Sequence, residues 1–273
     1  MIESSVPALA LAFTLGTVIG LVMALTGAGG GVLAIPLLVF GLHLPLPQAA
    51  PIGLVAVGLA AVIGAGLGLR QGIVRYRAAA LIGIVGMLVA PLGVYLAQRL
   101  PNRPLLGAFA LVLIYSAWRM LKRPSQAAQL PVAVLCRVNS KDQRLTWTRP
   151  CARALAGTGL IAGLLSGLLG VGGGFVIIPA LRRHTDLDVR SIQATSLAVI
   201  ALVSMSAIAT AALHAPVLWA VALPFAAGAV LALLIGRRIA QKLDAQRLQQ
   251  AFAWFCVLVA ILMLARAAGW VAN

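Results

Sequence analysis

The stretch "LTGAGGGVLAIPLL" (Leu25–Leu38) places four glycines and a proline inside one of the most apolar parts of the chain. A second stretch, "LLGVGGGFVIIPAL" (Leu168–Leu181), repeats the same pattern. In a helix interior, glycine costs about 1 kcal/mol and proline about 3 kcal/mol relative to alanine. The two stretches therefore predict that the chain interrupts its helices twice, in the same way.

These two stretches belong to an internal repeat. Gly20–Leu38 aligns with Gly163–Leu181 without a gap, at an offset of 143, with ten identities in nineteen positions. The same offset relates "GVYLAQRL" (Gly93–Leu100) to "GRRIAQKL" (Gly236–Leu243). Shared apolar composition would match only a few positions. We therefore divide the chain into a first membrane repeat (1–121), a basic cytoplasmic linker (122–153) and a second membrane repeat (154–273).

The composition is that of a membrane protein. Of the 273 residues, 62% are hydrophobic and 10% are charged, whereas a soluble domain has about 25% charged residues. Apolar runs of about 20 residues can each cross roughly 30 Å of hydrocarbon. Examples are Pro7–Leu25, Ala49–Leu69, Ala78–Ala97, Leu105–Leu121, Ile192–Leu213 and Gln249–Ala265. We expect an all-α, polytopic membrane protein whose first run is retained, because no basic segment precedes it as in a secretory signal.

The net charge of +16 lies almost wholly in the short segments between the apolar runs, which argues against nucleic-acid binding. If the two halves crossed in parallel, four times each, basic residues would divide almost evenly between the two sides. If each half is a Gly-rich re-entrant or broken helix hairpin plus three spanning helices, seventeen lie inside and three outside. The positive-inside rule favours the second arrangement. We therefore predict inverted repeats with both termini outside.

Broken helices offer a chemical function. The first turn of a helix has unpaired N–H groups and a positive dipole end, which together bind anions. Inverted-repeat transporters hold substrate near the midplane where such breaks meet. The alternative is that the glycines serve only close helix packing, as the small-residue spacing of "GTGLIAGLLSG" (Gly157–Gly167) indicates.

Polar residues at the start of one apolar helix extend this hypothesis. In "RSIQATSLAVI" (Arg190–Ile200) the side-chain oxygens can cap the helix, or they can offer donors to an anion. The predicted substrate-binding residues are Gly29, Gly30, Gly31, Gly172, Gly173, Gly174, Gln48, Gln193, Thr195 and Ser196. The first half has Ala50 and Pro51 where Thr195 and Ser196 stand, so the site should be asymmetric.

No acidic or basic residue lies in the middle of an apolar run, which favours an anion held by neutral donors over a cation held by a carboxylate. We expect no catalytic residue, metal site or cofactor. His43 and His214 lie just outside apolar runs, as interfacial or proton-coupling residues. The three cysteines, at 136, 151 and 256, follow no disulfide or metal spacing, and we assign them no role.

Three motifs make the chain resemble the sulfite exporter TauE/SafE family of bacterial membrane transporters. They are "GAGGGVLAIPLL" (Gly27–Leu38), "GVGGGFVIIPAL" (Gly170–Leu181) and "ATSL" (Ala194–Leu197). The resemblance implies a secondary transporter that exports sulfite or an organosulfonate across the bacterial cytoplasmic (inner) membrane. It also implies that the glycines, Thr195 and Ser196 lie near the transport path.

Two other classes of function remain open. A passive anion channel or a structural membrane subunit would show the same hydropathy. An intramembrane enzyme is disfavoured because no histidine or aspartate lies within an apolar run to act as a base. The expected partners are a small anion, protons as coupling ion, the lipid bilayer and a second copy in a homodimer, with no nucleic acid.

Overall fold

The computed structural model describes residues 6–26, 31–121, 135–136, 148–214, 217–240 and 245–267. Gly29 and Gly30 lie outside these described residues. Within them the chain is helical and has no strand, as expected for an all-α fold. The helices are α1 (Val6–Thr26), α2 (Ala34–Gly41), α3 (Leu46–Arg70), α4 (Tyr76–Arg99), α5 (Asn102–Leu121), α6 (Arg149–Leu169), α7 (Gly174–His184), α8 (Val189–His214), α9 (Trp219–Ala240) and α10 (Ala245–Ala267).

Six of these helices, α1, α3, α4, α6, α8 and α9, are long and apolar enough to cross a membrane. Large apolar side chains stand on their outer faces; Leu88 is 75% exposed and Leu213 is 84% exposed. An aqueous surface would disfavour such exposure, whereas lipid accepts it. The protein is therefore a multi-pass membrane protein.

The second glycine motif turns the chain between α6 and α7. Gly170, Gly172 and Gly173 have φ angles of 71°, 74° and 73°, a left-handed conformation that glycine adopts without the penalty of a Cβ atom. With 8 and 11 residues, α2 and α7 are too short to span 30 Å of hydrocarbon. Each half thus pairs a long first helix with a short second one.

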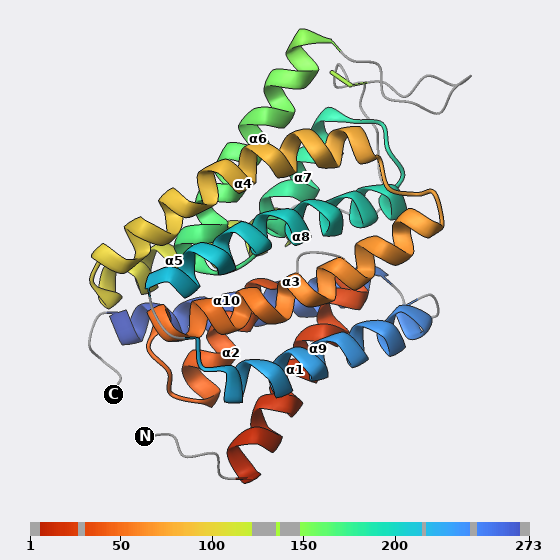
Figure 1. Ribbon diagram of the computed structural model, residues 1–273. Helices are drawn as coiled ribbons and strands as arrows, with labels where there is room; N and C mark the ends of the chain where they lie inside the picture. Colours follow the sequence, from red (N-terminus) through yellow and green to blue (C-terminus); the bar gives the residue numbers. More distant parts are fainter. Residues whose placement is uncertain are drawn as a thin grey trace.

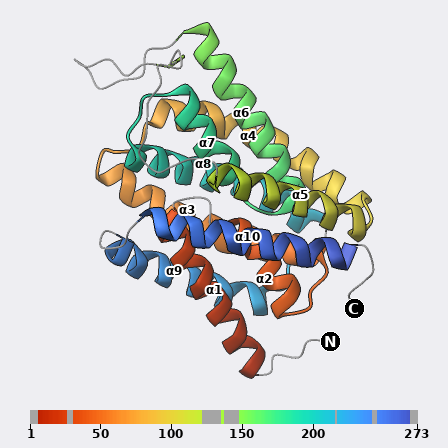
Figure 2. The same cartoon turned by 180° about the vertical axis from the view of Figure 1, so that it is seen from behind.

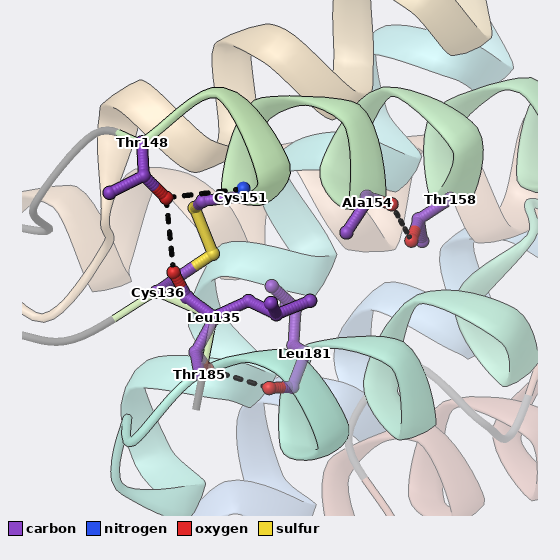
Figure 3. The surroundings of a disulfide bond; sticks show 8 residues. All are labelled: Leu135, Cys136, Thr148, Cys151, Ala154, Thr158, Leu181 and Thr185. Atoms are coloured by element: carbon purple, nitrogen blue, oxygen red, sulfur yellow. Dashed lines mark hydrogen bonds between the residues drawn. A yellow bond between two sulfur atoms is a disulfide. The ribbon is translucent and has the colours of Figure 1, made fainter. Parts of the chain in front are cut away.

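A disulfide shows which way α7 runs. Cys136 bonds to Cys151 in the first turn of α6, and its N–H donates to the carbonyl of His184, at the end of α7, over 2.9 Å. Thr148 caps α6 beside this bond, as Figure 3 shows. The end of α7 therefore lies next to the start of α6, so the two helices form a hairpin.

This disulfide corrects the expectation that the cysteines have no structural role. The two cysteines are separated by 15 residues, and no further cysteine pair marks a disulfide framework in the sequence. Their proximity arises because α6 and α7 bring both ends of the hairpin to one place. Helix α6 also begins at Arg149, so five residues that we assigned to the linker (149–153) are helical.

The fourth helix of each half, α4 or α9, packs against the first helix of the other half. Helix α1 packs along α9, α6 packs along α4, α3 packs on α8, and α5 packs on α10. Helices α1, α2, α3 and α9 form a first bundle, and α6, α7, α8 and α4 form a second one. Figures 1 and 2 show the two bundles on opposite sides of the molecule, meeting near α3.

Glycines allow the backbones of α6 and α4, and those of α1 and α9, to approach closely. Cβ atoms at Gly159 and Gly163 of α6 would collide with the backbone carbonyls of Ile82 and Gly86 of α4. The same two contacts recur between α1 and α9, where Gly16 packs on Phe225 and Gly20 packs on Ala229. Each of these four residues is related to its counterpart in the α6–α4 contacts by the offset of 143. The small-residue spacing is thus confirmed as a packing device.

Helices α3 and α8 occupy equivalent places in the two halves and run antiparallel. Gly58 faces Ser204, Gly64 faces Leu197, and Gly68 faces Ala194, so the numbering rises along α3 as it falls along α8. Gly58 and Ser204 lie near the middle of their helices. The two bundles therefore meet along a pair of helices related by the repeat.

Basic residues gather at one end of the molecule. The end of α3, the start of α4 and the start of α8 meet there, since the backbone N–H of Arg75 donates to Thr195 Oγ1. The end of α9 joins them because Arg237 donates to the carbonyl of Gly64 in α3. The basic residues of these segments and of the adjacent α6–α7 hairpin end are Arg70, Arg75, Arg77, Arg149, Arg153, Arg182, Arg183, Arg190, Arg237 and Arg238.

Candidate functional site

The two glycine motifs meet where the bundles touch. A Cβ atom on Gly31 would lie 3.1 Å from the carbonyl oxygen of Val171 in the other motif. A Cβ atom on Gly172 would lie 3.0 Å from Val57 Cγ1 of α3 and 3.0 Å from Ile200 Cγ2 of α8. The structure thus brings the described glycines together between α3 and α8, at mid-length of both helices.

These glycines are buried and closely packed. A Cβ atom on Gly173 would lie 2.8 Å from the carbonyl oxygen of Ala162 in α6. Helix α7 begins after Gly173, which has no side chain to cap it, and the N–H of Val176 donates to the carbonyl of Gly173 over 3.0 Å. The N–H groups of Gly174 and Phe175 therefore receive no acceptor from the cap residue. The second motif therefore serves close packing, and its turn carries the N-terminus of α7 into the interface between the bundles.

Thr195 connects the two halves. Its side chain is fully buried, and its Oγ1 accepts the 3.0 Å hydrogen bond from the N–H of Arg75, which precedes α4. The bond supplies an acceptor for the N–H of Arg75, the N-cap residue of α4. The hydroxyl hydrogen of Thr195 can still donate to another group.

The two glutamines lie apart. Gln48 is exposed on the first turn of α3, and Gln193 is half-buried near the start of α8. Because α3 and α8 run antiparallel, their first turns lie at opposite ends of the pair. His43 is exposed in the α2–α3 connection with φ 54°, and the side chain of His214 lies outside what the structure describes.

Two groups with shifted pKa values, His184 and Asp188, lie at the end of α7 and in the α7–α8 connection. Burial raises the pKa of the Asp188 carboxyl, but hydrogen bonds led by that from Ser191 outweigh it and hold this pKa below its ordinary value. Burial, and then the positive charge of Arg183, lower the pKa of His184. Both groups belong to the basic end of the molecule, away from the glycine turns.

Sequence reasoning missed two polar residues at the centre. Ser166 of α6 and Ser204 of α8 are fully buried, as is the predicted Ser196. Within the described residues, none of the three hydroxyls has a hydrogen-bond partner. A signal for Ser204 was present, because Ser196 and Ser204 are eight residues apart and therefore share one face of a helix.

The sulfite exporter TauE/SafE family profile matches residues 12–263, which is nearly the whole chain. The chain belongs to the sulfite exporter TauE/SafE family.

Relatives of this TauE/SafE member carry a similar description. Two proteins from Xylella fastidiosa, one in strain 9a5c and one in strain Temecula1 / ATCC 700964, are both described as "Probable membrane transporter protein". Each is 29% identical to this chain, with 92% of this chain and 93% of the relative covered. No solved structure matches the chain. The chain is accordingly a membrane transporter of the TauE/SafE family.

Proposed function

We propose that this protein is a secondary transporter that exports a small anion, sulfite or an organosulfonate, across the bacterial inner membrane. The observation that carries the proposal is the contact of Gly31, from the first glycine motif, with Val171 of the second motif, between the two bundles and next to the start of α7. Helix N-termini attract anions. Within the described helices, the basic residues lie near helix ends, so neutral donors would hold the substrate.

Alternating access follows from the two bundles. Each bundle contains one hairpin and one exchanged fourth helix, and the bundles touch mainly through α3 against α8 and α5 against α10. Rocking one bundle against the other would open the α3–α8 interface to one side at a time. The described arrangement, in which Gly31, Gly172 and Gly173 are buried, corresponds to a closed state of that interface.

The inverted topology is part of the same proposal. Antiparallel α3 and α8 support a pseudo-two-fold axis in the membrane plane, and the hairpin of α6 and α7 supports three spanning helices plus one re-entrant hairpin in each half. The gathering of arginines at one end supports a cytoplasmic position for that end. Both termini would then lie outside, with protons as the first coupling ion to test.

A flux screen tests the function. Purified protein in proteoliposomes is loaded with sulfite, a sulfonate such as taurine, sulfate, nitrate or chloride, with and without a pH gradient. We expect saturable efflux of sulfite or the sulfonate that responds to the gradient. Flux without saturation would identify a passive channel, and absence of flux for every anion would identify a structural subunit.

A further inference from the structure

Several hydroxyls in these helices donate to a carbonyl of their own helix, as serine and threonine commonly do. Ser116 donates to the carbonyl of Val112 over 2.8 Å, and Thr158 donates to the carbonyl of Ala154 over 2.8 Å. Ser206 donates instead to the carbonyl of Met87 in α4. The buried hydroxyls of Ser166, Ser196 and Ser204 have no partner within the described residues. Buried hydroxyls without a partner are rare in proteins and call for a specific explanation.

Ser204 lies directly at the start of the second hairpin's short helix. Its Oγ lies 3.6 Å from the position of a Cβ atom on Gly172, one residue before the Gly173 cap of α7. Ile200, which touches the same glycine, lies one turn earlier on α8. Ser196 lies one further turn toward the basic end, on the same face.

Ser166 approaches the same turn from α6. Its carbonyl accepts the N–H of Gly170 over 2.8 Å. Ala162, one turn earlier on the same face, is the residue that Gly173 packs against. The hydroxyls of Ser166 and Ser204 thus stand on the two helices that flank the start of α7.

We propose that Ser166 and Ser204, together with the N–H groups of Gly174 and Phe175 at the start of α7, form the oxyanion-binding site of this transporter. The inference rests on the proposed anion transport and names the residues that select the substrate. Hydroxyl and amide donors approaching from different helices suit an anion with several acceptor oxygens, such as sulfite or a sulfonate. Ser196 lies on α8 between this site and the basic end of the molecule.

The site is built in the second half of the chain alone. The counterpart of Ser166 in the first half is Met23, and in the alignment that pairs Ala50 with Thr195 the counterpart of Ser204 is Leu59. Neither side chain has a hydrogen-bond donor. One anion would therefore bind next to α7, although the sequence contains the glycine motif twice.

The test compares Ser166→Ala and Ser204→Ala with Ser116→Ala, a control that removes a hydroxyl bonded to its own helix. Two readouts are used: the KM for sulfite efflux from proteoliposomes, and the thermal stabilisation of the detergent-solubilised protein by sodium sulfite, against sodium chloride at equal ionic strength. We expect each site variant to raise KM roughly tenfold and to lose most of the sulfite-specific stabilisation. The control should keep both.

Stability without ligand separates a binding role from a structural one. Because each site hydroxyl lacks a partner, its removal should leave the unliganded melting temperature unchanged or raise it. Saturable sulfite transport by the wild type, with unchanged KM and stabilisation in both variants, would overturn the site and leave the transport function intact. If the wild type transported none of the anions, both would fail. Equal stabilisation by sulfite and chloride would overturn the preference for an oxyanion.

Discussion

Thr195 Oγ1 accepts a hydrogen bond from the backbone N–H of Arg75 over 3.0 Å, across 120 residues of sequence. The bond joins α8 of the second half to the residue that precedes α4 of the first half. Both groups lie at the end of the molecule where arginines gather. One side chain therefore ties the bundle interface to the α3–α4 connection.

Replacing this side chain should weaken the connection. Thr195→Val keeps the shape of the side chain but leaves the N–H of Arg75 without its acceptor, which costs about 1–3 kcal/mol. We expect the midpoint of thermal unfolding in detergent to fall for Thr195→Val and to stay close to the wild type for Thr195→Ser. Equal midpoints for all three proteins would show that the bond contributes nothing.

The close contact of α6 with α4 can be tested within one helix. A Cβ atom at Gly163 would collide with the backbone of Gly86, whereas one at Gly157 meets nothing within 4 Å. Gly163→Ala should lower the free energy of unfolding by about 1–3 kcal/mol because the backbones must separate. Gly157→Ala should be neutral or stabilising, since alanine favours a helix. The prediction is contradicted if the two variants denature alike.

The turn before α7 should tolerate no side chain. Gly173 has φ 73°, and its Cβ would lie 2.8 Å from the carbonyl of Ala162. We expect Gly173→Leu to abolish uptake of labelled sulfite into inside-out vesicles while the protein remains in the membrane fraction. Gly66→Leu, at an open position on α3, is the matched control and should transport normally. Normal uptake by Gly173→Leu would disprove a role for this turn in transport.

The sidedness of the arginines gives a direct topology test. In a chain whose native cysteines are replaced by serine, Arg77→Cys and Arg238→Cys should react with an impermeant thiol reagent only when the cytoplasmic face is open. Arg103→Cys, at the start of α5, should react in intact cells. The expectation follows from the positive-inside rule. Labelling of Arg77→Cys or Arg238→Cys from outside would exclude the inverted arrangement that we propose.

The disulfide offers a second, independent measure of sidedness. Cys136 and Cys151 lie at the same end as the arginines. The bacterial cytoplasm keeps thiols reduced, whereas the periplasm oxidises them. With a cytoplasmic linker, we expect acid-trapped cells to show both cysteines as thiols, and the bond to form on purification in air. A bond already complete in growing cells would place the linker outside and reverse the topology.

The breaks in the helices and the membrane class were predictable because they depend on local chemistry. Gly172 and Gly173 take left-handed angles that residues with a Cβ atom rarely adopt, and long apolar runs need lipid whatever their neighbours are. The repeat was also visible, since identical residues recur at an offset of 143. These properties belong to short segments, so the sequence by itself determined them.

Only the tertiary structure decided which segments meet. The exchange of α4 and α9 between bundles, the Cys136–Cys151 bond and the partner of Thr195 all join residues that no local pattern relates. The candidate site contains residues that the sequence analysis did not predict, for the same reason. Burial removes water from a hydroxyl, and only the packing of α6, α7 and α8 shows that Ser166 and Ser204 are left without a partner next to the glycine turn.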